Sequence, residues 1–223
     1  MFNLLLKYHA PNLQSLHLTS VKENVSTYNV PYVIDSFSDF PYLRALSIDF
    51  DFVTPKFLAA LAHKDRKSPP LLSLCLHVHR VNQKPPTDSM WKEVMASNHN
   101  LELTLNLVHS SDGLQSLLDV LKPSMPLTCY RQFFCGDVSV ASLNVMSSHY
   151  YSTLSSITII EAICDQPINY ALNGVEDPFV MLAWRCTRLQ SLKLIGKLLN
   201  FFFNQIFKIS LILVLVFLFC FFV

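Results

Sequence analysis

The sequence predicts an α/β fold: a leucine-rich-repeat solenoid in which parallel strands line a concave face and helices pack outside. The first observation is a phrase of the form Pro-x-Leu-x-x-Leu-x-(Leu/Ile), which occurs at residues 11–18, 41–48 and 69–76. Copies without the proline occur at residues 154–159 and 189–194. The second observation is spacing, because the first leucines at positions 13, 43 and 71 are separated by 30 and 28 residues. This interval is typical of strand-plus-helix repeats, so we expect about six to seven irregular repeats of roughly 26 to 35 residues.

Composition excludes several classes of protein. The 17 Lys+Arg residues balance 16 Asp+Glu residues, and no basic run offers a footprint for phosphates, so we expect no nucleic-acid partner. Four glycines argue against glycine-rich phosphate loops. The six cysteines form no Cys-x-x-Cys pair, and no apolar signal peptide precedes the first repeat. These features predict reduced thiols and a cytoplasmic protein, with the nucleus as the alternative compartment.

The order of the elements follows from the strand phrases and from helix caps. A capping residue before proline opens helices at Thr54-Pro55 and Asp177-Pro178, because proline lacks the N–H that a first helical turn leaves unpaired. Thr87-Asp88 and Ser111-Asp112 cap two more helices. In chain order we expect the end of a helix at 2–10, a strand at 13–18, a near-helical segment at 32–40, a strand at 41–48, a helix at 56–63, a strand at 71–78, a helix at 89–97, a strand at 101–107, a helix at 111–121, a strand at 127–134, a helix at 138–150, a strand at 154–160, a loop at 161–175, a helix at 178–186 and a strand from 189.

The helices should turn their apolar residues toward the sheet. Trp91 is expected in the core. In the helix at 111–121, Leu114, Leu117, Leu118 and Leu121 are expected on one side. The repeat is degenerate between residues 101 and 134, so we expect the stack to be irregular in its middle.

The strand phrase also predicts which side chains a partner can reach. Its last two apolar positions share one face of the strand, so the residues between them point to the other face. One repeat cannot bury its apolar face alone, and stacking therefore leaves the polar residues on the concave surface. Ala45 and Cys75 share this face with residues that are small, polar and mostly uncharged, as suits docking of a protein. The predicted protein-binding residues are Ser15, His17, Thr19, Ser47, Asp49, Ser73, His77, Thr104, Asn106, Ser156, Thr158, Ser191 and Lys193.

No set of residues predicts chemistry. His77 and His79 lie on one face of a strand, but a zinc or iron site needs at least three well-placed ligands and no third is visible. No Gly-x-Ser-x-Gly, His-Glu-x-x-His or Walker pattern occurs. We therefore expect no catalytic residue, no metal and no cofactor.

With the repeats laid out, residues 41–48 and the longer segment 177–189 around Trp184 resemble the leucine-rich region of F-box proteins. The resemblance covers roughly residues 1–196. It implies the substrate-recognition part of an SCF-type cullin-RING E3 ubiquitin ligase, in which an F-box helix cluster binds the Skp1 adaptor and the repeats hold a protein substrate. It also implies that the chain is not an enzyme.

The sequence departs from this family before the first repeat. An F-box should precede the repeats, and the residues before Leu13 leave no room for it. Engagement of Skp1 and cullin therefore requires an F-box upstream. Neither end of the stack carries a polar capping unit, so we expect the chain to be a fragment of a longer substrate receptor.

Residues 197–223 are predicted to form a hydrophobic tail distinct from the repeat domain at 1–196. Residues 209–223 are almost all apolar, but Asn204, Gln205 and Lys208 interrupt the longer window that a spanning helix needs. One interpretation is a marginal C-terminal membrane anchor, which would make the chain a membrane-anchored leucine-rich scaffold without a ligase role. The other is translated intron, because residues 196–197 can be encoded by GGTAAG, which matches a splice donor.

Overall fold

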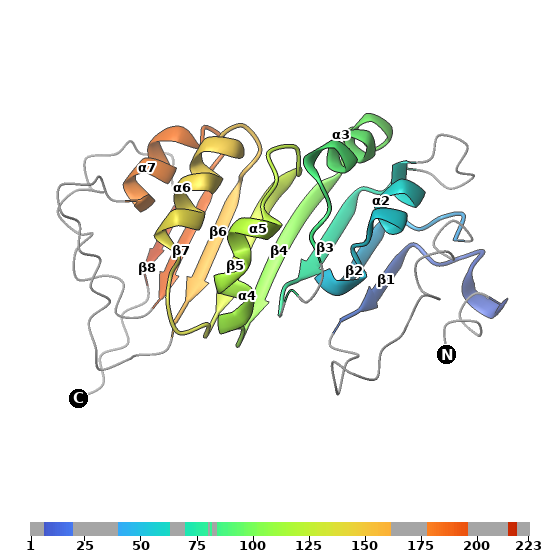
Figure 1. Ribbon diagram of the computed structural model, residues 1–223, viewed down its shortest axis with the longest axis horizontal. Helices are drawn as coiled ribbons and strands as arrows, with labels where there is room; N and C mark the ends of the chain where they lie inside the picture. Colours follow the sequence, from blue (N-terminus) through green and yellow to red (C-terminus); the bar gives the residue numbers. More distant parts are fainter. Residues whose placement is uncertain are drawn as a thin grey trace.

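The chain forms one parallel sheet whose strands follow sequence order. The computed structural model describes residues 7–19, 40–62, 70–79, 81, 84–161, 178–195 and 214–217, the last of these by backbone alone. Within them the strand order is β1-β2-β3-β4-β5-β6-β7-β8, with every neighbouring pair parallel (Figure 1). The strands are β1 (Ser15–Leu18), β2 (Ala45–Asp49), β3 (Ser73–His77), β4 (Glu102–Val108), β5 (Leu127–Phe133), β6 (Ser156–Ile160), β7 (Ser191–Ile195) and β8 (Val214–Phe217).

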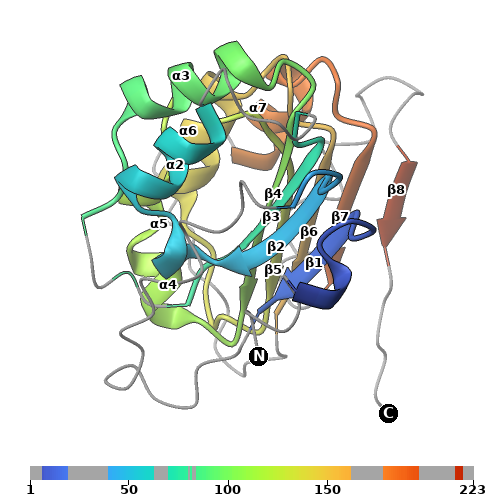
Figure 2. The same cartoon turned by 90° about the vertical axis from the view of Figure 1, so that its right-hand side faces the viewer.

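Among the described residues, the helices that follow the second strand lie on one face of this sheet and none of them lies on the opposite face, as the two perpendicular views show (Figures 1 and 2). The helical elements are η2 (Phe50–Phe52), α2 (Pro55–Ala62), α3 (Asp88–Ser97), α4 (Ser111–Gln115), α5 (Leu117–Val120), α6 (Val140–His149) and α7 (Pro178–Arg185). The α/β class and the sequential parallel sheet are confirmed, and both are compatible with a solenoid.

The strand phrase sets the register between neighbouring strands. Leu46 of β2 lies opposite Leu16 of β1 and Leu74 of β3, so equivalent leucines form a continuous row. The ladder extends beyond the strands, because the carbonyl of Gln14 accepts hydrogen bonds from the N–H groups of Arg44 and Ala45, at 2.8 and 3.0 Å. These bonds, with the strand pairing, join the phrase to the adjacent repeat and so fix the side-chain alternation of both.

The core lies between the sheet and the helices. Leu74, Leu103 and Ile157 face it from the strands with no exposed surface, and Trp91 faces it from α3, as predicted. Full burial of one such aliphatic side chain contributes about 1.5–3 kcal/mol. The repeats therefore depend on their neighbours for most of their stability.

The helix predicted at 111–121 is two short helices with a break at Ser116. Ser110, rather than Ser111, caps α4, because its hydroxyl accepts a hydrogen bond from the N–H of Gly113 at 3.1 Å. The new turn at Ser116 shifts the helical phase, so Val120 enters the core while Leu118 is 45 % exposed. Leu118 therefore does not share the side of Leu114, Leu117 and Leu121, which are buried, and the prediction of one side for all four is wrong.

The other predicted caps differ in outcome. Thr54 caps α2, since its Oγ1 accepts a hydrogen bond from the N–H of Phe57 at 3.2 Å. Thr87 precedes α3 but makes no such bond, because its Oγ1 pairs with Ser89 Oγ at 2.9 Å. Asp177 and the near-helical segment at 32–39 lie outside the described residues, and so does all of the loop at 161–175 except Glu161.

The irregular middle of the stack is confirmed at the junction of β4 and β5. The register shifts between Leu103 and Thr104, which face Leu127 and Cys129. Beyond the shift, β5 places Gln132 where the repeat pattern predicts an apolar residue.

The hydrophobic tail contributes β8, whose backbone pairs in parallel with β7. Among the residues that the structure describes, no helix is long and apolar enough to cross a membrane. The boundary between repeats and tail at residue 197 stays a prediction.

The Asn98 side chain is expected to be a main source of stability in the first repeats. It is buried, and its Nδ2 donates to the carbonyls of Leu61 and Val94, both at 3.0 Å, while its Oδ1 accepts from the N–H of Leu71 at 2.9 Å. Asn98→Ala removes all three side-chain bonds and takes from the buried Leu71 N–H its acceptor, so it should lower the free energy of unfolding by about 2–4 kcal/mol. Urea denaturation measures this, with the exposed neighbour Asn100→Ala as the matched control. An equal effect of both substitutions would contradict the assignment.

Candidate protein-binding surface

The open face is the side of the sheet opposite the helices. Strand alternation places on it every second residue, and the burial pattern of β3, β4, β6 and β7 follows the same period of two. Its residues are Ser15, His17, Ala45, Ser47, Asp49, Ser73, Cys75, His77, Glu102, Thr104, Asn106, Val108, Cys129, Arg131, Phe133, Ser156, Thr158, Ile160, Ser191, Lys193 and Ile195.

The register arranges these side chains in rows that cross the strands. One row runs through His17, Ser47, Cys75, Thr104, Cys129, Ser156 and Ser191. The next row runs through Asp49, His77, Asn106, Arg131, Thr158 and Lys193. Of the predicted binding residues, Thr19 alone lies outside the strands, just after β1, where it is half-buried. The other twelve share the open face.

Two predicted contact residues lie on the open face but are covered. Ser47 is 3 % exposed and Asp49 is 2 % exposed, so the expectation that both would be accessible is wrong. The reason is packing between repeats, because both side chains are short and imidazoles of the next repeat lie beside them. Ser47 Oγ lies 3.1 Å from His77 Nε2, and Asp49 Oδ1 lies 3.7 Å from His79 Nε2. Both residues therefore position the histidines rather than meet a partner.

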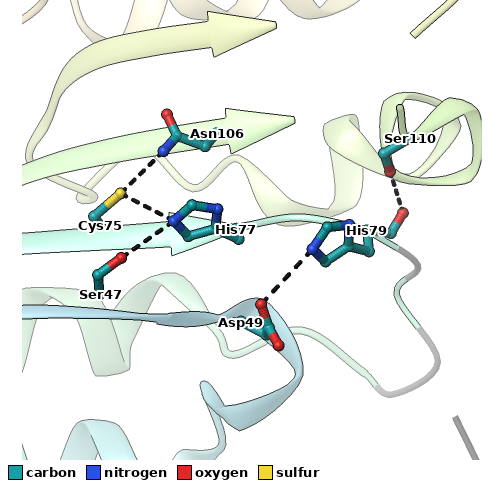
Figure 3. A network of polar contacts seen from close by, with 7 residues as sticks. All are labelled: Ser47, Asp49, Cys75, His77, His79, Asn106 and Ser110. Carbon is teal, nitrogen blue, oxygen red and sulfur yellow. Dashed lines mark hydrogen bonds and ion pairs between the residues drawn. The ribbon is translucent and has the colours of Figure 1, made fainter. Parts of the chain in front are cut away.

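A polar network joins β2, β3 and β4 at this point (Figure 3). His77 Nε2 lies 3.5 Å from Cys75 Sγ as well as near Ser47, and Asn106 Nδ2 donates to the same sulfur at 3.2 Å. His79 lies beyond β3, where its carbonyl accepts a hydrogen bond from Ser110 Oγ. The network ties three repeats together through side chains, in addition to the backbone ladder.

The two histidines do not converge on one point. His77 faces the Cys75 sulfur, whereas His79 pairs with Asp49. Within the described ranges no group of three or more His, Cys, Asp or Glu side chains is placed to hold a metal ion. Burial raises the pKa of the Cys75 thiol above its usual value, although the Ser47 hydroxyl and the Arg131 charge act in the opposite direction. A buried, protonated thiol is a poor nucleophile.

The sequence interpretation missed the part of the open face that β5 contributes. Arg131 is exposed and Phe133 is half-buried, and both alternate with the core residues Tyr130 and Gln132. The alternation of core and open-face residues in β5 is hard to read from the sequence, because the polar Gln132 occupies a core position where a leucine is expected. The structure shows its partner: Gln132 Nε2 donates to the buried Glu161 carboxylate at 2.5 Å. No local sequence signal joins Gln132 to Glu161, which lies 29 residues later, just after β6.

An apolar row borders the polar rows at the carboxyl ends of the strands. Val108, Phe133, Ile160 and Ile195 are in register there, and Val108 is 37 % exposed. Just beyond, the exposed Phe134 stacks on His109 with ring centroids 5.2 Å apart and planes inclined by 17°. The open face is therefore polar in its centre and apolar along one edge.

Similarity to known proteins extends over most of the chain. Over 189 residues it is 28 % identical to F-box only protein 33 of Mus musculus, and over 187 residues it is 26 % identical to F-box only protein 33 of Homo sapiens. Each alignment covers 81 % of this chain and 33 % of the relative, so the chain spans about a third of the length of these relatives. No protein-family model matches it.

These alignments relate the chain to F-box proteins, in agreement with the resemblance at residues 41–48 and 177–189. Trp184, at the centre of the longer segment, is 61 % exposed on α7. It lies on the helical side, so it does not belong to the open face (Figure 1).

The His77 imidazole should make stability depend on pH. Burial lowers its pKa below 6.5; His79 and His17 add to this effect, and Asp49 opposes it. Below pH 6.5 the His77 imidazole of the unfolded chain binds a proton that the folded chain does not bind. The free energy of unfolding is therefore highest above pH 6.5 and falls as the pH drops through the folded-state pKa of His77. His77→Gln should therefore lose less free energy of unfolding between about pH 7.5 and about pH 5 than the wild-type chain. Urea denaturation at the two pH values measures this.

The exposed His99 supplies the control, since His99→Gln should leave the pH dependence of the wild-type chain in place. A His77 ring that titrates above pH 6.5 by NMR would contradict the prediction.

Proposed function

We propose that this chain is the substrate-recognition part of an SCF-type cullin-RING E3 ubiquitin ligase. Its fold is a leucine-rich-repeat solenoid, and its open face binds a protein substrate. The similarity to F-box only protein 33 over 81 % of the chain is the observation that carries the proposal. The chain recognises the substrate and does not catalyse a reaction, and it acts in the cytoplasm. Contact with Skp1 and cullin would be made by an F-box upstream of the repeats.

The chemistry of the open face supports protein binding. Its central residues include Ser, Thr, Cys and Asn side chains, which cost less to desolvate than charged groups and offer both donors and acceptors. They stand on a sheet whose backbone groups are paired with the adjacent repeats. A surface fixed in this way loses little conformational entropy when a partner docks.

The arrangement of the cysteine and histidine residues also favours recognition. His77 and Cys75 bond to side chains of the same face, and burial keeps the Cys75 thiol protonated. They therefore supply rigidity to the surface between β2 and β4. The exposed residues around them, such as Ser73 and His17, supply contacts.

A photo-crosslinking side chain tests the proposal directly. Placed at the exposed Ser73 on the open face, it should capture proteins whose ubiquitylation falls when cullin neddylation is inhibited in cells. The same group at Glu93, which is exposed on α3, provides the control and should capture these proteins far less. Mass spectrometry of crosslinked proteins and of ubiquitin remnants gives both readouts. Equal capture from Ser73 and Glu93 would overturn the proposal. So would captured proteins whose ubiquitylation does not change when cullin neddylation is inhibited.

A further inference from the structure

The half of the open face formed by β5, β6 and β7 carries two exposed cations in one row. Arg131 of β5 and Lys193 of β7 both lie opposite Thr158 of β6. Adjacent strands are about 4.8 Å apart, so the two Cα atoms are separated by roughly 10 Å. The residue between them is a threonine, which leaves both charged groups accessible from the same side.

Neither cation has an acidic partner within the part of the chain that the structure describes. The ion pairs there join His79 to Asp49 and Lys92 to Asp88. On the open face, the acidic residues are Asp49, which is buried beside His79, and Glu102 at the amino end of β4. Positive charge therefore gathers on one half of the surface, where it favours a negatively charged partner.

An apolar strip runs beside these cations, two residues further along each strand. It consists of Phe133, Ile160 and Ile195, which follow Arg131, Thr158 and Lys193 at a spacing of two. Phe134 and His109 continue it at the carboxyl edge, with φ values of 55° and 49°.

The backbone at this edge is held in place by the buried Glu161. Its Oε2 accepts a hydrogen bond from the N–H of Gly136 at 2.8 Å, and its Oε1 accepts from Gln132 Nε2. The Gln132 amide in turn accepts from Tyr130 Oη at 2.7 Å. Because this network fixes the turn after β5, the aromatic pair is presented in one arrangement.

We propose that this half of the open face binds an acidic, extended segment of a protein substrate in which carboxylates alternate with apolar residues. The inference rests on the proposed function and names its substrate class. A segment that crosses the strands directs successive side chains to opposite sides. One set of side chains then meets Arg131 and Lys193, and the other set packs on Phe133, Ile160 and Ile195.

The small number of cations favours carboxylates over a phosphate group. Phosphate recognition gathers several Arg or Lys side chains around one point. Here Arg131 and Lys193 start from separate strands with Thr158 between them, so each can meet its own carboxylate of one extended segment. A nucleic acid is disfavoured too, because the chain has a net charge of +1 and this half of the face offers two cations.

Fluorescence anisotropy with a labelled synthetic peptide of alternating glutamate and leucine tests the inference on the full chain. Binding is expected, and added salt should weaken it, because exposed charges are screened. Arg131→Glu and Lys193→Glu should each raise the Kd at least about tenfold, which corresponds to about 1.4 kcal/mol. The control is Lys56→Glu, an exposed cation in the first turn of α2 on the helical side, and it should leave the Kd unchanged.

Companion peptides separate charge from the apolar contacts. A glutamate–serine peptide should bind more weakly than the glutamate–leucine peptide, and Ile160→Thr should reduce this difference, because it removes apolar surface from the strip. A lysine–leucine peptide should not bind. Circular dichroism of each variant confirms that the sheet is retained.

Several results would overturn the inference. They are equal binding of glutamate–leucine and lysine–leucine peptides, binding that appears only when phosphoserine replaces glutamate, and preferred binding of a single-stranded RNA oligonucleotide. Failure of the peptide to bind, while crosslinks from Ser73 still yield substrates of a cullin ligase, would reject the acidic class and leave the proposed function standing. Loss of both would reject the proposed function as well.

Discussion

The structure depends on one constraint: an apolar strand face that no single repeat can bury. Leu46 is covered because β1 and β3 flank it in register, on the face of the sheet where the helices pack. The backbone ladder from Gln14 to Arg44 and onward enforces the same register. Once the register is fixed, the opposite face of every strand is fixed too, and the polar surface follows from the packing of the apolar one.

Rows that cross the strands give this surface its properties. Side chains from separate repeats become neighbours, so His77 of β3 covers Ser47 of β2, although the two residues are distant in sequence. His77 also contacts Cys75 on its own strand. Such contacts make one half of the face rigid and mostly uncharged. The half that carries Arg131 and Lys193 keeps its charges free of acidic neighbours among the described residues. A rigid frame with a charged, partly apolar region is suited to selecting one extended segment.

The sequence similarity and the structure each support the proposal that this chain binds a protein substrate. The alignment with F-box only protein 33 relates the chain to a family, at modest identity and over about a third of that protein. The structure adds a sequential parallel sheet and, within the described ranges, a face opposite the helices α2 to α7. In the tail, the backbone of β8 extends the sheet beyond β7.

The sequence by itself determined the α/β class, the positions of most strands and helices, and the side of the sheet on which twelve of the thirteen predicted contact residues lie. It could do so because alternation and capping are local properties of the chain. Tertiary structure alone decided the exposure of those residues, since Ser47 and Asp49 are covered by imidazoles from the next repeat. It also decided the place of Arg131, because the Gln132–Glu161 pair that fixes β5 joins residues distant in sequence. Contacts between repeats depend on register, and register is a property of the assembled sheet.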